Sequence, residues 1–362
     1  MKKNIMLMAG PTAIPEREIK AMDRQVPFHR SKEFEDIAKE LNENLKKVFK
    51  TKEEVMVLTG SGTAAMEAAV QNCFSAGDEV IVAVLGVFSA RMASMAEAYG
   101  LNVKRITKPN GEIVTVDEVM AQMTENTKGV FIVHNESATG VTCDIQAFGE
   151  ALKDTGTLLV VDTVSGIGAL EFAFDDWHVD VAFASSQKAL MGAPGTAVIC
   201  LSQKAWKAVE TSTLPKFYLD LKLAKEFGEK GQHPWTPAIY SIIGLNESVK
   251  MIVEEGIDNV VKRNEKLSKM VVEGMAKLGI HQFAKDPSYA SKSVNTFAYD
   301  KSPQFVAKLA KEYGVQIYNG QADLYDTTFR VGTMGYVCET DIAAFLYAAE
   351  QVINELEQGA DK

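Results

Sequence analysis

The sequence is poor in cysteine. It has four in 362 residues, and no two of them form a Cys-x-x-Cys pair. This spacing excludes a zinc knuckle and a dithiol redox pair, and we predict no metal site. Because disulfides are rare in reducing compartments, we expect buried free thiols in a cytoplasmic protein. The four are Cys73, Cys143, Cys200 and Cys338.

Long apolar stretches and an excess of positive charge are also missing. The longest apolar run, Val80 to Phe88, is far shorter than the roughly 20 residues that a membrane helix needs. The apolar run near the start is too short for a signal peptide, and Pro11 and Pro15 follow it at once. With 38 Lys+Arg against 48 Asp+Glu, the formal net charge is −10, which counts against a general nucleic-acid binder. We therefore expect neither a membrane nor a nucleic acid as a partner.

What the sequence does have is an alternation of apolar strands and amphipathic helices. Continuous apolar strands separated by helices predict a parallel sheet that is buried on both faces. The last two apolar runs are too close together for a helical crossover, so we expect a hairpin in that part of the sheet. The expected strands are residues 55–58, 80–84, 103–106, 130–133, 158–161, 179–184 and 197–201, and the helices between them are 64–73, 90–99, 116–123 and 145–153.

A second, smaller α/β unit is expected after about residue 250. Two helical segments rich in lysine and glutamate come first, then short strands and a final helix. The expected helices are 245–255, 257–278 and 341–356, and the strands are 293–299 and 329–331. We predict an N-terminal segment (1–15), a large domain (16–255) and a small C-terminal domain (256–362).

Three strand ends carry the residues of chemical interest, because ligands of such sheets bind at the carboxyl ends of strands. Small residues Ser61, Gly62 and Thr63 begin a helix and would suit a phosphate, although a plain helix cap is the simpler reading. Asp162 ends a buried strand, either paired with a cation or capping a turn. Lys188 follows another strand, either as a desolvated nucleophilic amine or as an ordinary surface lysine. Together they are what pyridoxal phosphate requires.

The chain resembles a known family at this point, the class V (fold-type I) aminotransferases, in the alanine–glyoxylate and serine–pyruvate branch. The matching segments keep the order of the family and extend over nearly the whole chain. The resemblance implies a fold-type I architecture, with a mainly parallel seven-stranded sheet flanked by helices and a smaller C-terminal α/β domain. The segments are AGPT (9–12), FHRSKEF (28–34), GSGTAAMEA (60–68), HNESATGV (134–141), VVDTVSGIG (160–168), SSQKAL (185–190), PGTA (194–197), TPAIYS (236–241) and FRVGTMG (329–335).

The resemblance implies a role for each matching position. Lys188 would form the Schiff base with pyridoxal phosphate and then move the proton, and Asp162 would pair with the pyridine nitrogen. Arg330 would bind the substrate α-carboxylate, which its planar fork suits. The implied cofactor-binding residues are Ser61, Gly62, Thr63, Phe88 (ring stacking), Ser137 (ring hydroxyl), Val164 (other ring face), Gln187 and Thr236, the last from a neighbouring subunit of a homodimer; the Gly10 backbone would line the substrate pocket.

Some positions depart from the family pattern or favour a structural role. Phe88 stands where a tryptophan is common, and His233 stands where one branch has a tyrosine, so the contact of Thr236 with the phosphate is only partly supported. A structural role is the simpler reading of His134 and Cys338. His29 and Arg30 are expected to order a dimer-facing N-terminal segment.

The leading hypothesis is an aminotransferase that moves an amino group from alanine or serine to glyoxylate or pyruvate. One carboxylate-binding arginine with no obvious second cation favours small side chains. A 2-aminoethylphosphonate–pyruvate aminotransferase is the first alternative, with Arg24, Arg30 and Arg91 as candidate cations for the phosphonate. A desulfurase would need a mobile cysteine, which residues 318–328 lack. A lyase, or a cofactor-binding protein without turnover, completes the alternatives.

Overall fold

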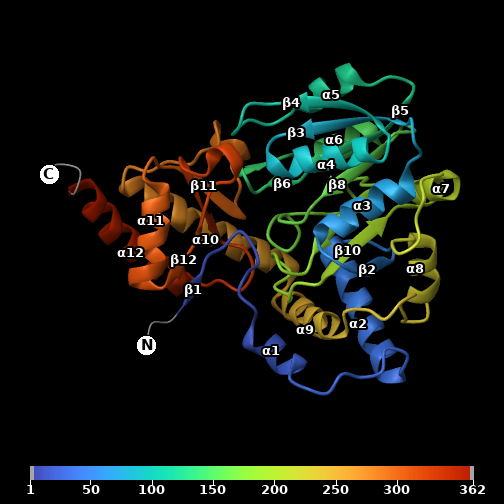
Figure 1. Ribbon diagram of the computed structural model, residues 1–362, viewed down its shortest axis with the longest axis horizontal. Coiled ribbons are helices and arrows are strands. Elements are labelled where there is room, and N and C mark those ends of the chain that lie inside the picture. Colours follow the sequence, from blue (N-terminus) through green and yellow to red (C-terminus); the bar gives the residue numbers. More distant parts are fainter. Residues whose placement is uncertain (1–3, 359–362) are drawn as a thin grey trace.

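The computed structural model describes residues 4–358 and is built around one seven-stranded sheet (Figure 1). The strand order is β2-β10-β9-β8-β5-β3-β4. Strand β10 runs antiparallel to both of its neighbours, and the other neighbouring pairs are parallel. The strands are β2 (Val55–Thr59), β3 (Glu79–Val84), β4 (Asn102–Thr107), β5 (Thr127–Val133), β8 (Leu158–Asp162), β9 (Val181–Ser185) and β10 (Thr196–Leu201).

Helices cover both faces of this sheet, and successive residues of each strand point to opposite faces. In β5, Val130 and Ile132 join one buried core, while Phe131 and Val133 join the other. One face carries α3 (Gly62–Cys73), α4 (Val87–Ala98) and α7 (Gln203–Thr211), and the opposite face carries α2 (Lys32–Phe49), α5 (Val116–Gln122), α6 (Ile145–Leu152) and α9 (Ile239–Glu255).

The C-terminal third forms a second unit with its own core. A three-stranded antiparallel sheet has the order β11-β14-β13, and its core includes Phe297, Phe305 and Phe329. Figure 1 shows this unit beside the large sheet, with the last helix on its outer side. Its elements are α10 (Ile257–Lys277), β11 (Val294–Ala298), α11 (Ser302–Lys308), β12 (Val315–Gln316), β13 (Tyr318–Asn319), β14 (Thr328–Gly332) and α12 (Glu339–Gln358), with short helical turns at Pro287–Tyr289, Leu309–Tyr313 and Ala322–Leu324.

The N-terminal segment connects the two units. Strand β1 (Ile5–Met6) pairs with β12 of the small unit, and Leu7 is buried in its core. The chain then passes the carboxyl edge of the large sheet and forms α1 (Glu16–Met22), which packs on α9. The remaining elements are the hairpin β6 (Asn135–Glu136) with β7 (Val141–Thr142), and α8 (Leu221–Gly228).

The predicted fold class is confirmed, including the hairpin, which is β9 with β10. The boundaries after residues 15 and 255 stay predictions. One expectation is wrong: Cys338 is exposed, because it lies in the turn before α12 with its Sγ 3.0 Å from Thr340 Oγ1. The other three cysteines are buried, and all four are free. Within residues 4–358, no helix is long and apolar enough to cross a membrane.

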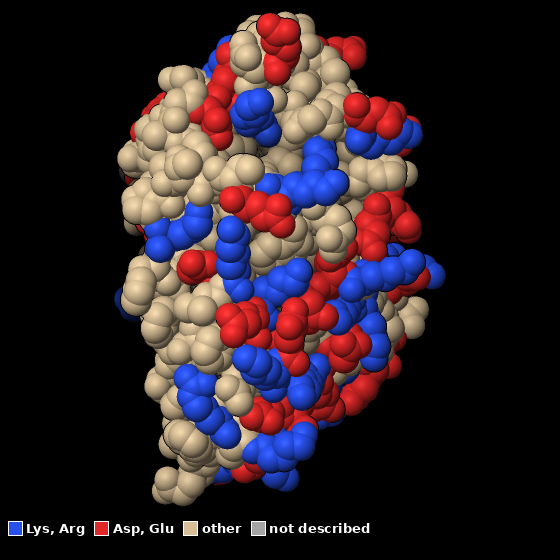
Figure 2. All heavy atoms as spheres, turned by 90° about the vertical axis from the view of Figure 1, so that its right-hand side faces the viewer, with Lys and Arg blue, Asp and Glu red and all other residues tan. Residues whose placement is uncertain are grey.

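One face of the molecule carries an even mixture of charges. Figure 2 shows lysine and arginine side chains interspersed with aspartate and glutamate, without a broad area of one sign on this face. Such mixing keeps a surface soluble without creating a strong field of one sign. The groups of chemical interest lie inside, at the carboxyl edge of the large sheet.

Candidate functional site

A cavity of about 240 Å³ lies at the carboxyl ends of β2, β5, β8 and β9. Sheets of this kind place their ligands at this edge, as expected from the sequence. The cavity takes in ten of the twelve predicted site residues; the exceptions are Arg330 and Thr236. Its lining residues are Gly10, Pro11, Ser61, Gly62, Thr63, Met66, Phe88, Arg91, Val133, Asn135, Ser137, Asp162, Val164, Ser165, Ser185, Gln187 and Lys188.

The turn after β2 presents the start of α3 to this cavity. Ser61 is the N-cap residue, but its side chain makes no capping hydrogen bond, so the simpler reading of a plain cap does not hold. A Cβ at Gly62 would lie 2.9 Å from Val164 Cγ2 and 3.3 Å from Ser185 Cβ, so a larger residue would push into the cradle. Exposed N–H groups at a helix start, close to small residues, suit an anion.

Asp162 ends β8 and is 5% exposed. Its Oδ1 accepts a hydrogen bond from the Val164 N–H at 2.9 Å. Burial raises the pKa of this carboxyl to about 7, opposed by that hydrogen bond and by the positive charge of Lys188. A buried carboxyl of this kind is best stabilised by a cationic partner in the cavity.

Lys188 reaches the same cavity from the turn after β9. Its backbone is fixed by the N-terminal segment, because Thr12 N donates to Gln187 O at 3.0 Å and Thr12 Oγ1 donates to Lys188 O at 2.8 Å. Its Nζ donates to Ala9 O. Burial, together with the nearby charge of Arg330, lowers the pKa of Lys188 to about 8. The amine is therefore available as a nucleophile near neutral pH.

Phe88 stands on the first turn of α4, and a buried carboxylate fixes that turn. Glu136 accepts from Ser89 N at 2.9 Å, Ser89 Oγ at 2.8 Å, Phe88 N at 3.4 Å and Ala138 N at 3.3 Å. Burial raises the pKa of Glu136. Glu136 lies inside the segment HNESATGV, but its sequence context alone predicts no role for it.

Arg330 comes from β14 of the small unit and is 5% exposed. Its Nη1 donates to Ser137 O at 3.3 Å and its Nε donates to Asn319 O at 3.0 Å. The guanidinium thus lies next to a residue that lines the cavity. Burial lowers the pKa of Arg330 to about 10, and the charge of Glu136 opposes this shift. Arg330 stays a cation at neutral pH.

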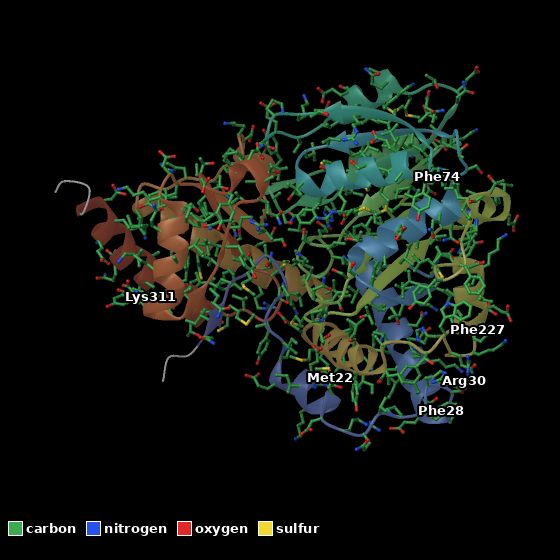
Figure 3. All side chains as sticks on the ribbon, viewed as in Figure 1. Met22, Phe28, Arg30, Phe74, Phe227 and Lys311 are labelled. Carbon is green, nitrogen blue, oxygen red and sulfur yellow. The ribbon has the colours of Figure 1, made fainter. Side chains whose placement is uncertain are left out.

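Other predicted residues lie elsewhere. Thr236 is exposed and lines a separate groove with His233 and Trp235. Arg30 donates to Gln232 Oε1 at 3.0 Å and lies over the ring of Phe227, at the lower right edge of the view in Figure 3. None of these residues lines the cavity that Lys188 enters.

Two further candidates, His134 and Arg24, lie in different surroundings. His134 is buried against Phe172 and Trp177, and burial lowers its pKa to about 4. Arg24 donates to Glu33, away from the cavity. Both positions suit structural residues.

Seven cavity residues were not assigned to the site from the sequence, and three of them bear on its chemistry. Arg91 lies over the Phe88 ring, with 4.9 Å from its Cζ to the ring centroid, and its Nη1 is 3.5 Å from Thr63 Oγ1. From the sequence, Arg91 was expected only as a candidate cation for a phosphonate. Asn135 Nδ2 donates to Ser165 Oγ, and Ser185 ends β9 directly before the lysine turn. The strand-end rule would have found Asn135 and Ser185, had it been applied to every polar residue there.

Comparisons with known proteins show the family of the chain. The family model described as "Aminotransferase class-V" matches residues 6–345. A serine–glyoxylate aminotransferase of Methylorubrum extorquens is 35% identical, with 96% of this chain and 90% of that protein covered. An L-aspartate–glyoxylate aminotransferase of Paracoccus denitrificans is 34% identical, with 98% and 92% covered. The crystal structure of an alanine–glyoxylate aminotransferase from Nostoc sp. is similar at a TM-score of 0.93 and 27% identity, with 98% of this chain and 96% of that one covered.

Proposed function

The chain belongs to the class V aminotransferases, and from this premise we propose that it moves an amino group from alanine or serine to glyoxylate or pyruvate. Aminotransferases of this family use pyridoxal phosphate. Serine and glyoxylate stand in the name of the relative from Methylorubrum extorquens, and alanine and glyoxylate in the name of the structural neighbour from Nostoc. The observation that supports this most is that Asp162, at the end of β8, and Lys188, from the turn after the neighbouring β9, line one cavity beside the start of α3.

The residues of the cavity fit this cofactor. Within the described chain, the buried Ser185 Oγ and Gln187 Oε1 have no hydrogen-bond partner, so polar atoms are available to a bound group. The start of α3, with Ser61 and Thr63, would hold the phosphate. Asp162 would pair with the pyridine nitrogen, and Phe88 and Val164 would pack on the two ring faces.

Each protein group then has one task. When bound, pyridoxal phosphate supplies the carbonyl that takes up the amine and the electron sink for the donor's α-carbon. Lys188, whose lowered pKa favours the neutral and nucleophilic amine, would hold the cofactor and, once the donor has displaced it, would move the proton that leaves the α-carbon. Arg330 binds the α-carboxylate and so orients that carbon–hydrogen bond. Ser137 would donate to the ring hydroxyl, and Gly10 leaves room beside the lysine.

A homodimer with shared active sites completes the proposal. Thr236 is exposed in one subunit and would reach the phosphate of the other. Large apolar side chains are exposed and would be covered by a second copy: Phe217, which stacks on Trp235 next to Thr236, is 77% exposed, and Phe28 is 64% exposed. The four free cysteines support a cytoplasmic location. Sedimentation tests the dimer. Mixing the inactive Lys188→Ala and Thr236→Val proteins tests the shared site, because a mixed dimer would have one site with both residues intact and should regain activity.

An absorption spectrum tests the main proposal. The protein loaded with pyridoxal phosphate should show a visible band. Alanine or serine should abolish this band in the absence of an acceptor, and glyoxylate or pyruvate should restore it. The Lys188→Ala protein should lack the visible band of a lysine-linked cofactor. A wild-type protein that takes up no cofactor, or one that no amino donor converts, would contradict the proposal.

A donor with an anionic side chain is the second candidate, favoured by the position of Arg91. This arginine lines the cavity, and no carboxylate of residues 4–358 forms an ion pair with it. The relative from Paracoccus denitrificans is named for L-aspartate. Aspartate and 2-aminoethylphosphonate should therefore be tested beside alanine. If Arg91 binds the distal anion, Arg91→Leu weakens aspartate or the phosphonate about 30-fold or more and leaves alanine unchanged.

A further inference from the structure

Glu18 of α1 is a buried carboxyl outside the cavity. It is 0% exposed, and its Oε1 accepts a hydrogen bond from Ala193 N at 2.7 Å. Its Oε2 has no hydrogen-bond partner in the described part of the chain. A Cβ at Gly244 of α9 would lie 2.6 Å from Glu18 Oε1 and 2.9 Å from Met22 Sδ, so α9 has a glycine where the two side chains dock. Figure 3 shows Met22 at this junction of α1 with α9.

Ala193 belongs to the loop that carries the lysine. Its carbonyl accepts from Ser186 Oγ at 2.6 Å, and Gly192 N donates to Ser186 O at 2.7 Å, which closes the loop around Lys188. The N-terminal segment grips the start of this loop through Thr12 and its end through Glu18. The same segment carries Gly10, against which the lysine side chain packs.

We propose that Glu18 is a positioning residue for Lys188, which ties the N-terminal segment to the lysine loop and does so as an uncharged carboxylic acid. The inference rests on the proposed function in one respect, namely that Lys188 carries the cofactor. Loss of this tie would free the segment 9–18 and the loop 186–193 to move relative to each other. The lysine would then be held less well at the place where it meets the cofactor.

The surroundings of Glu18 favour the uncharged form. Burial raises the pKa of Glu18 to about 7, and the Ala193 N–H, followed by the nearby Ser248 hydroxyl, opposes the shift. The neighbouring Arg17 turns away to Glu247 and Glu254 on the outer side of α9. The loop that follows the lysine, residues 191–195, has no ionisable side chain. Ionisation would therefore place a charge in an apolar junction without a counter-charge.

The test compares cofactor binding by four proteins between pH 5.5 and 8.5. These are wild type, Glu18→Gln, Glu18→Ala and the control Glu16→Gln, which changes an exposed carboxylate on the same helix. The dissociation constant for pyridoxal phosphate and the pH midpoint of the visible band are measured for each. Glutamine keeps the acceptor for Ala193 N and cannot ionise, whereas alanine removes the tie at every pH.

We expect Glu18→Gln to bind the cofactor like wild type near pH 5.5 and about tenfold more tightly near pH 8.5, where wild-type Glu18 is ionised. We expect Glu18→Ala to bind at least tenfold more weakly throughout, with a shifted band midpoint, and Glu16→Gln to follow wild type. A ratio of Glu18→Gln to wild type that stays flat with pH would overturn the inference, and this comparison decides even if Glu18→Ala does not fold. A wild-type protein that binds no cofactor would instead contradict the proposed function.

Discussion

Replacing Arg330 by lysine tests the substrate contact most directly. A guanidinium has five N–H donors. Asn319 O and Ser137 O accept two of them, so three remain for the substrate, enough for two parallel bonds to a carboxylate. Lysine keeps the charge and loses the fork. One lost charge-assisted hydrogen bond is worth about 1.5–3 kcal/mol, which corresponds to about a 10- to 150-fold loss.

The assay is the half-reaction of the loaded protein with alanine, followed by the loss of the visible band under single turnover. For Arg330→Lys, the second-order rate constant for alanine should fall by about this factor, while the affinity for pyridoxal phosphate stays the same. Ethylamine, which is alanine without its carboxylate, is the matched control and should react equally slowly with both proteins. If alanine reacted within threefold of the wild-type rate, or if ethylamine lost as much as alanine, Arg330 would not bind the carboxylate.

Three further predictions concern Lys188, Gly10 beside it and the buried Glu136. Since burial lowers the pKa of Lys188 to about 8, the amine is neutral above that pH, so the rate of cofactor capture should rise up to about pH 8 and then level off; a rise continuing to pH 10 would contradict this. Gly10→Ala should lower the cofactor content, and in urea titration it should lower the unfolding free energy by at least about 2 kcal/mol. The reason is that the φ of Gly10 is +110° and a Cβ there would lie 2.6 Å from Lys188 Nζ; a normal cofactor content would refute the close packing. Glu136→Ala should lower the unfolding free energy by about 3–5 kcal/mol in the same titration, because four donors, three of them buried, lose their acceptor, and Glu136→Gln by less; equal losses would argue against the hydrogen bonds.

The sequence predicts the large sheet and its strand-end residues well. Continuous apolar strands announce burial on both faces, and the ends of such strands are where Asp162 and Lys188 lie. The antiparallel β10 was also predictable, because a short connection forbids a crossover helix. Helix α2 was missed although Phe34, Leu41 and Leu45 follow its period and are buried.

Contacts between distant segments are what the sequence could not supply. In the sequence, nothing distinguishes Glu136 and Glu18 from other acidic residues. Only the fold brings distant backbone N–H groups to their carboxyl groups. Arg91 looked like one of several surface cations until α4 placed it beside Phe88. Thr236 differs from these residues, because its predicted contact is with the cofactor of another subunit.

Strand β10 separates two of the strands whose ends form the cavity. It lies between β2 and β9, with Thr196 opposite Thr59 and Ala197 opposite Ser185. Strands β2 and β9 are therefore two strand spacings apart, about 9.6 Å, and the start of α3 bridges part of this distance, since a Cβ at Gly62 would lie 3.3 Å from Ser185 Cβ. A one-residue slip of β10 would change its register against β2 and β9 together and would turn its side chains to the opposite faces of the sheet.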